Sequence, residues 1–284
     1  MTVPAGWVTL AGERTDDGIP IMTQEATPRP AATILLLRDG SAGLEVFMVV
    51  RHHAIDFASG ALVFPGGRVE DDDHLLASRL SADDAAGSDN AFRIAAIRET
   101  FEECGVLLAR PRGSSRLIGA ATLKMVEDRH RAALNAGTVN FETVLAEADL
   151  LPASDLLVHF AHWITPANQP KRYDTQFFLA EAPAEHLAVH DGTEAVESMW
   201  IRPAQALAET EAGHFKLVFA TAKNLEKLSR WRTAAEALEA TRTSSVVTVL
   251  PHSTKLEGGR RLLRIPAEAD YGGAEFVVEM PPAS

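Results

Sequence analysis

The sequence predicts a mixed α/β fold, and three observations support this prediction. Apolar runs of strand length recur along the chain, and two of them are joined by the turn signal Arg38-Asp39-Gly40. Longer stretches with apolar residues at helical spacing lie between and after these runs. The chain has 284 residues, which is enough to bury a full core. We expect one domain at residues 30–284, preceded by an N-terminal surface segment, residues 1–29, that is rich in Pro, Gly and Asp.

The expected elements follow one another in a clear order. Strands are expected at residues 31–37, 44–51 and 61–64, and a helix at residues 90–104. Asn90 is placed to cap the start of this helix, and Gly105 to end it. Helices at residues 115–135 and 140–149 make up a helical insertion at about residues 111–152. The remaining elements are strands at residues 156–164, 172–180 and 195–201, a helix that begins at Pro203, a C-terminal helical extension with a long helix at residues 215–240, and short strands near residues 246–249, 262–265 and 276–278.

Three glutamates, Glu99, Glu102 and Glu103, lie on one side of the helix expected at residues 90–104. Their spacings make them neighbours on the helix surface, where like charges raise each other's pKa unless a cation offsets them. Hard oxygen ligands in such a cluster suit Mg2+ or Mn2+, which commonly serve phosphate chemistry. The alternative is a solvated acidic face, because an apolar stripe runs along the opposite side of the helix, at Ile94, Ile97, Phe101, Cys104 and Leu108.

The order of the parts favours a site over a solvated face. An apolar strand leads into Phe64-Pro65-Gly66-Gly67, an acidic loop follows, and the acidic helix comes next. This order resembles the signature of the Nudix hydrolase family, G-x5-E-x7-R-E-U-x-E-E-x-G-U, in which U is a bulky aliphatic residue. Gly67 opens the signature, while Asp73 and Thr100 stand where it has its first Glu and its first U. The second half matches at Arg98, Glu99, Glu102, Glu103, Gly105 and Val106.

The spacing inside this Nudix box differs from the family pattern. Between Asp73 and Arg98 lie 24 residues where the pattern has seven, so the box contains a 17-residue insert at about residues 74–90. We expect this insert to form a loop or a short helix. The branch of the peroxisomal coenzyme A and acyl-coenzyme A diphosphatases also has an insert inside its Nudix box, and the chain resembles that branch in this feature. The likeness to that branch extends through residues 57–67, 162–166 and 172–178.

The chain fits the coenzyme A pattern of that branch, R-[SA]-x3-R-x3-G-x3-F-P-G-G, only in part. Arg51 and Gly60 are in register, but His52 takes the small-residue position and Asp56 replaces the second Arg. The loss of that cation weakens the prediction of a coenzyme A pocket.

The resemblance implies a Nudix α/β/α sandwich with a mixed sheet, and it implies a role for each box residue. Mg2+ or Mn2+ would be held by Gly66, through its carbonyl, and by Glu99, Glu102 and Glu103. Glu99 is a ligand or the general base, and Arg98 is the arginine that orients a glutamate.

Other charged residues are candidates for the same site. Glu194 or Glu197 could supply a further glutamate, or either could be a solvated residue at a strand start. Arg51 and Arg172 are candidates for substrate binding. The basic run Arg260, Arg261 and Arg264 could meet a substrate phosphate, although such a run is also typical of a solvated strand edge.

The function implied is metal-dependent hydrolysis of the pyrophosphate in a nucleoside diphosphate linked to another group. Coenzyme A or acyl-coenzyme A is the first choice of substrate, and ADP-ribose or a dinucleotide is the alternative. A catalytically silent nucleotide-binding regulatory module is the alternative class of protein, but the complete glutamate set favours an enzyme. A net charge of −12 argues against a nucleic-acid or anionic-membrane partner. We expect a cytoplasmic enzyme for a small-molecule nucleoside diphosphate derivative and, by resemblance, a homodimer.

Overall fold

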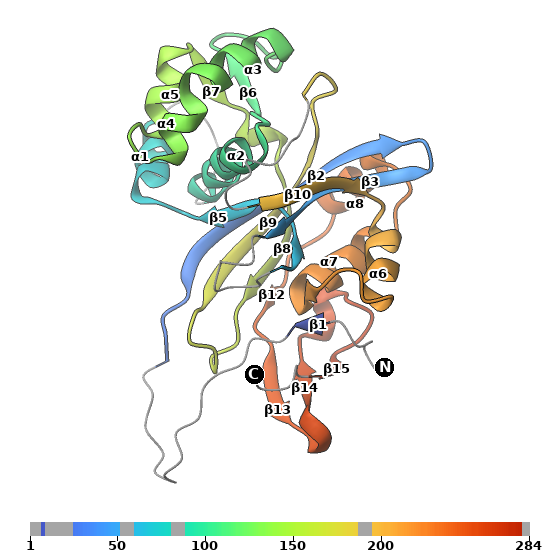
Figure 1. Cartoon of the computed structure of the whole chain (residues 1–284). Coiled ribbons are helices and arrows are strands. Elements are labelled where there is room, and N and C mark those ends of the chain that lie inside the picture. The colour runs from blue at the N-terminus through green and yellow to red at the C-terminus, as the bar shows by residue number, and fades with distance from the viewer. Residues whose placement is uncertain (1–6, 9–24, 52–59, 81–88, 187–194, 280–284) are drawn as a thin grey trace.

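A mixed sheet forms the centre of the molecule, and helices cover both of its faces (Figure 1). The computed structural model describes residues 7–8, 25–51, 60–80, 89–186 and 195–279. In spatial order the strands are β10 (Ala195–Ile201), β3 (Gly43–Arg51), β2 (Arg29–Gly40), β9 (Tyr173–Glu181), β8 (Val158–Ile164) and β12 (Thr248–Val249). Two short strands, β4 (Leu62–Val63) and β5 (Gly66–Arg68), pair with β3 and β2. The β2–β9 and β8–β12 pairs are parallel, whereas the other pairs in this sheet are antiparallel.

Side chains along β2 alternate between two cores, as expected for a strand buried on both faces. Ile34 and Leu36 belong to the core shared with α2 (Asn90–Cys104). Leu35 and Leu37 belong to the core shared with α7 (Phe219–Leu228) and α8 (Ala234–Arg242). The sheet therefore lies between two helical layers, which confirms the α/β/α sandwich.

The two helical layers differ in size (Figure 1). The layer with α2 also contains α1 (Asp71–Leu80), α3 (Ala120–Val126), a π-helical turn (Glu127–Arg131), α4 (Ala132–Asn135), α5 (Phe141–Glu147) and the short pair β6 (Ala109–Pro111) and β7 (Leu150–Pro152). The layer with α7 and α8 is completed by α6 (Pro203–Glu211). None of the helices in the described ranges combines the length and apolarity needed to span a bilayer.

A small antiparallel sheet lies beyond β12, next to the layer of α7 (Figure 1). Its strands are β13 (His252–Lys255), β14 (Arg260–Arg264) and β15 (Glu275–Glu279), with β14 in the middle. The strands expected near residues 262–265 and 276–278 thus belong to a sheet of their own. A further parallel pair joins β1 (Trp7–Val8) to β11 (Leu217–Val218).

The prediction of one long helix at residues 215–240 is wrong, because this segment forms two helices. α7 ends at Leu228, and α8 begins at Ala234 with Thr233 as its N-cap. The Thr233 hydroxyl accepts a hydrogen bond from the Glu236 N–H, which satisfies a backbone donor at the new helix start.

Two smaller boundaries also differ from the sequence predictions. The helix expected from residue 115 begins at Ala120. Asn90 is the first residue of α2 rather than its cap, since Asp89 holds the cap position and forms no side-chain cap hydrogen bond. Gly105 ends α2 in the left-handed conformation (φ 68°), and Cys104 is buried, both as expected. The domain boundary at residue 29 stays a prediction, because residues 9–24 lie outside the described ranges.

Candidate active site

The two halves of the interrupted box meet through an ion pair between Asp73 and Arg98. Asp73 lies in the first turn of α1 and is 2% exposed, and Arg98 lies on α2. The Arg98 Nε and Nη2 atoms donate to the two Asp73 carboxylate oxygens at 3.1 and 2.9 Å. The insert therefore begins within a helix, and its later part, residues 81–88, lies outside the described residues. Asp73 occupies the position that the resemblance assigns to the first Glu of the box.

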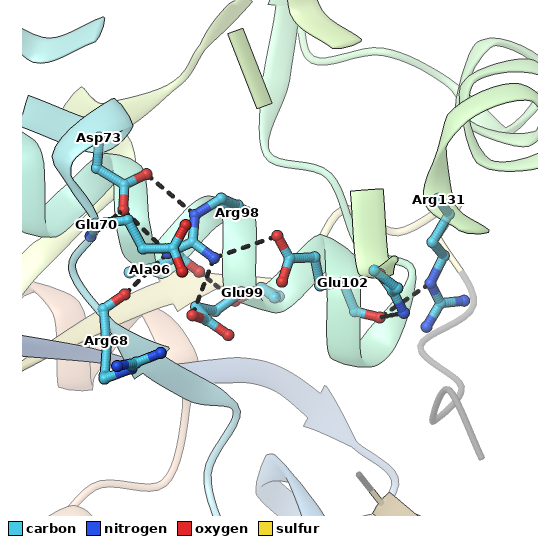
Figure 2. Close-up of polar contacts among 10 residues, drawn as sticks. Arg68, Glu70, Asp73, Ala96, Arg98, Glu99, Glu102 and Arg131 are labelled. Carbon is cyan, nitrogen blue, oxygen red and sulfur yellow. Dashed lines mark hydrogen bonds and ion pairs between the residues drawn. The ribbon is translucent and has the colours of Figure 1, made fainter. Parts of the chain in front are cut away.

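Arg98 also contacts two of the three box glutamates (Figure 2). Its Nη1 lies 3.0 Å from Glu99 Oε1 and 3.2 Å from Glu102 Oε1, and its Nη2 donates to the Arg68 carbonyl at 2.8 Å. One guanidinium thus faces three carboxylates and fixes the start of the box loop.

Burial and charge shift the pKa values of this cluster in ways that fit a further cation. Burial alone would lower the pKa of Arg98, but its hydrogen bond to Asp73 and the nearby carboxylates raise that pKa above its usual value. Burial raises the pKa of Glu102, and the charge of Arg98 offsets only part of this effect. Three carboxylates, Asp73, Glu99 and Glu102, contact this one guanidinium, so the cluster holds more negative charge than one arginine neutralises.

The glycine turn brings the other two predicted ligand positions to this cluster. The Gly66 N–H donates to Glu103 Oε2 at 3.0 Å. A Cβ at Gly67 would lie 2.4 Å from the Glu99 carboxylate, so any other residue here would displace that carboxylate from its observed position. The four positions predicted to hold metal, Gly66, Glu99, Glu102 and Glu103, therefore lie close together.

The donor set fits Mg2+ or Mn2+, because it consists of carboxylate oxygens and a peptide carbonyl around an excess of negative charge. Within the described ranges, no three acidic, His or Cys side chains are arranged as a ready-made metal site. Arg98 lies between Glu99 and Glu102 in the observed arrangement.

The end of α2 is held by the helical insertion. Arg131 Nε, from the π-helical turn, donates to the Glu102 carbonyl at 3.1 Å (Figure 2), and Asn135 Nδ2 donates to the same oxygen at 3.3 Å. Carbonyls in the last turn of a helix have no partner within the helix, so these two donors satisfy one of them. They also fix the backbone from which the Glu102 side chain extends.

A cavity of about 470 Å³ opens beside the carboxylates. Arg98, Glu99 and Glu102 line it at one side. Its floor consists of sheet residues that lie side by side on neighbouring strands: Ala31 and Thr33 of β2, Thr175 and Phe177 of β9, and Trp163 of β8. The start of α7 and the C-terminal sheet form the remaining walls. A cavity of this size, with polar and apolar walls, is typical of a site for a small molecule.

The two arginines predicted to bind substrate have different surroundings. Arg51, at the end of β3, lines the cavity, and its buried Nε has no hydrogen-bond partner among the described residues. Arg172 does not line the cavity as described. Its guanidinium instead donates to the carbonyls of Thr165 and Ala26, at 3.0 and 2.9 Å. Arg172 thus anchors backbone, and its contact with substrate stays a prediction.

Glu197, the later glutamate candidate that the described ranges include, does not join the cluster. Glu197 lies exposed on β10, where it pairs with Val50, and it does not line the cavity. Glu194 lies outside the described residues.

Several cavity residues were not singled out as site residues from sequence, among them Thr33, Trp163, Tyr173, Thr221 and Ser253. Trp163 and Tyr173 do belong to segments on which the family resemblance rests, and this is the signal that could have identified them.

A family model described as the NUDT19 Nudix domain matches residues 74–231, which is more than half of the chain. The chain belongs to the Nudix family, in its NUDT19 branch. The match includes the box helix α2 and ends before the C-terminal sheet.

Relatives and a solved structure agree with this family. A Caenorhabditis elegans protein named as a nudix hydrolase is 31% identical over 205 residues, which cover 71% of this chain and 61% of that protein. The acyl-coenzyme A diphosphatase NUDT19 of Xenopus laevis is 25% identical over 213 residues, which cover 61% of this chain and 56% of that protein. Both matches therefore span less than two thirds of the relative's length. The crystal structure of a Nudix hydrolase from Alicyclobacillus acidocaldarius superimposes with a TM-score of 0.61 at 27% identity, covering 79% of this chain and all of that one.

Proposed function

We propose that this protein hydrolyses the pyrophosphate of a nucleoside diphosphate linked to another group, with coenzyme A or acyl-coenzyme A as its substrate. The observation that carries the proposal is the pair Glu99 and Glu102 of α2, which contact Arg98 at the wall of a cavity large enough for a nucleotide. A protein that only binds a nucleotide has no need of a buried carboxylate beside a metal site.

The residues that would hold the metal are Glu99, Glu102 and Glu103, together with the Gly66 carbonyl. When bound, a divalent ion supplies charge neutralisation for the pyrophosphate oxygens and lowers the pKa of a bound water. Glu99 lines the cavity and is the residue we assign to accept the proton of the attacking water. Arg98 keeps Glu99 and Glu102 in place, and Arg51, which also lines the cavity, offers a cation to the phosphates. Cleavage of coenzyme A in this way gives adenosine 3′,5′-bisphosphate and 4′-phosphopantetheine.

Two findings support coenzyme A over other Nudix substrates. Relatives from Xenopus laevis and Homo sapiens are named acyl-coenzyme A diphosphatases, the human one being 34% identical over 129 residues. The cavity also has an apolar wall, formed by Trp163, Phe177, Phe219 and Leu263, beyond its carboxylate side. Such a wall suits an uncharged part of the substrate, such as the pantetheine arm, which ADP-ribose and dinucleotides lack.

The proposal is tested by measuring kcat/KM for coenzyme A, an acyl-coenzyme A, ADP-ribose and a dinucleotide, with Mg2+ and with Mn2+. We expect the coenzyme A compounds to be the best substrates and activity to be lost in excess EDTA. Glu99→Gln should lower kcat by about 10²–10⁴-fold, the usual contribution of a general base. Glu103→Gln should abolish metal-dependent turnover.

The control is Glu239→Gln, an exposed carboxylate on α8, which should leave kcat/KM unchanged. Faster turnover of ADP-ribose than of coenzyme A would reject the substrate assignment. Full activity of Glu103→Gln with an intact circular dichroism spectrum would contradict the assigned ligand role, and no turnover of any compound would favour a binding module.

The cytoplasmic location, the homodimer and the absence of a nucleic-acid partner stay predictions. Size-exclusion chromatography with light scattering measures the second of these directly.

A further inference from the structure

The C-terminal sheet forms one wall of the cavity, although it lies outside the matched Nudix domain. Ser253 of β13 and Arg261 and Leu263 of β14 all line the cavity. Ser253 pairs with Leu263, and Arg261 lies two residues before Leu263 on the same face of the strand. Arg260 and Arg264 alternate with them on the opposite face. Because successive residues of a strand face opposite sides, only Arg261 of this basic run faces the cavity.

This wall is held firmly against the sandwich. Val249, just before β13, pairs with Trp163 on β8. The Trp163 indole N–H donates to the Tyr271 hydroxyl at 3.0 Å, and that hydroxyl donates to Asn224 of α7 at 2.8 Å. Burial raises the pKa of Tyr271, so the hydroxyl keeps its proton and this chain of hydrogen bonds persists. The wall is thus fixed to both β8 and α7.

Arg261 is a partly buried cation with few hydrogen-bond acceptors among the described residues. Its Nη1 donates to the Ser253 hydroxyl at 3.0 Å, but its Nε is buried and has no acceptor among the described residues. No described carboxylate forms an ion pair with it, whereas Arg264 on the same strand pairs with Glu275 at 2.8 Å. A buried N–H on a charged group is costly without an acceptor, so an anion within reach of Arg261 would be stabilised here.

The start of α7 adds to the positive potential at this wall. Ala220 and Thr221, in the first turn of this ten-residue helix, line the cavity. The N-cap residue Val218 provides no side-chain hydrogen bond to the helix start. The helix dipole favours negative charge in front of such an end.

This cationic wall is separate from the carboxylates. The floor of the cavity crosses from β5, beside the carboxylates, through β2 and β9 to β8, beside the C-terminal sheet. Three interstrand spacings correspond to about 14 Å. An anion at Arg261 would therefore lie across the cavity from the proposed metal ligands, too far from them to belong to the same pyrophosphate.

We propose that Arg261 and Ser253 bind a second phosphate of the substrate, a phosphate monoester outside the pyrophosphate that is cleaved. This inference rests on the proposed function. For coenzyme A and its acyl esters, the group is the 3′-phosphate on the ribose. The C-terminal sheet is thus the specificity element that distinguishes 3′-phosphorylated substrates from the same molecules without that phosphate.

The test compares coenzyme A with 3′-dephospho-coenzyme A, which differ only in this phosphate. The wild-type protein should prefer coenzyme A. Arg261→Gln should lower kcat/KM for coenzyme A by about 10- to 100-fold, the worth of a charge-assisted hydrogen bond, chiefly through KM. The same variant should leave kcat/KM for the dephosphorylated compound within about threefold, because that compound never used the contact. Arg260→Gln, on the same strand but the opposite face, is the matched control and should behave as wild type with both compounds.

A binding measurement separates this inference from the proposed function. Calorimetry should show that adenosine 3′,5′-bisphosphate binds more tightly than AMP, and that Arg261→Gln removes the difference. If neither coenzyme A compound is cleaved but this difference in binding persists, the proposed function is wrong and the phosphate subsite stands. Equal losses on both coenzyme A compounds, no loss on either, or the same change in Arg260→Gln would overturn the subsite.

Discussion

The buried Asp73–Arg98 pair offers a quantitative test of how the interrupted box is held together. Asp73→Asn removes a charge that is 2% exposed and turns an amide N–H toward a guanidinium. Removing one partner of a buried pair costs about 3–5 kcal/mol, and we expect about 3 because Arg98 keeps its contacts with Glu99, Glu102 and the Arg68 carbonyl. This loss corresponds to a fall in Tm of roughly 6–12 °C for a chain of this size.

The matched control is a second carboxylate that pairs with an arginine through two hydrogen bonds, but at the surface. Asp155 accepts from Arg110 at 2.6 and 2.8 Å and is 62% exposed. Asp155→Asn should cost less than about 1 kcal/mol, because solvent screens an exposed pair. Urea titrations followed by circular dichroism measure both variants. Equal losses would refute the argument from burial.

The Asp73→Asn change should also reach the chemistry, since Arg98 positions two of the glutamates. Supporting residues behind metal ligands are typically worth about 10- to 100-fold in activity or metal affinity. We expect a fall of that size in kcat/KM for the best substrate at 20 °C below the Tm of the variant, and no fall for Asp155→Asn. Wild-type kinetics in a destabilised Asp73→Asn would show that Arg98 needs no help from Asp73.

Two further substitutions test the walls of the cavity. Gly67→Ala places a Cβ 2.4 Å from the Glu99 carboxylate and should displace it. We expect kcat to fall by about 100-fold while the circular dichroism spectrum stays unchanged. Normal kinetics would show that Glu99 can move without loss of activity. Tyr271→Phe leaves the Trp163 N–H and the Asn224 oxygen without their shared partner and should lower the free energy of unfolding by about 1–3 kcal/mol in a urea titration, whereas an unchanged midpoint would mean that the hydroxyl is dispensable.

The sequence predicted the box helix well because its signals are local. The buried stripe of α2, the left-handed Gly105 at its end and the spacing of its glutamates all lie within one short segment. The division between α7 and α8 was missed although its signal is local, because Thr233 and Glu236 have the spacing of a capping box. The start of α7 at Phe219 is different, since it follows Leu217–Val218, which pair with a strand from the start of the chain. Pairing between distant segments leaves no periodic trace in either of them.

The arginines show the same limit at the site. Arg51 and Arg172 were equal candidates in the sequence, but one lines the cavity and the other holds two backbone carbonyls. Arg261 was one of three neighbouring arginines, and only the register of β14 distinguishes it from the other two. The sequence shows where a charged residue stands, but the tertiary structure determines what that residue contacts.

The two hydrogen bonds that hold the end of α2 matter for any chimaera in which this Nudix box is placed in another protein. Arg131 and Asn135 hold the carbonyl of Glu102, yet both come from the helical insertion, well beyond the signature. A chimaera that carries only residues 66–105 would keep the acidic side chains of the box but lose the two side chains that hold the end of α2. A unit meant to keep this support therefore extends to at least residue 135, and we expect changes in the insertion to shift the Glu102 backbone without altering any residue that lines the cavity.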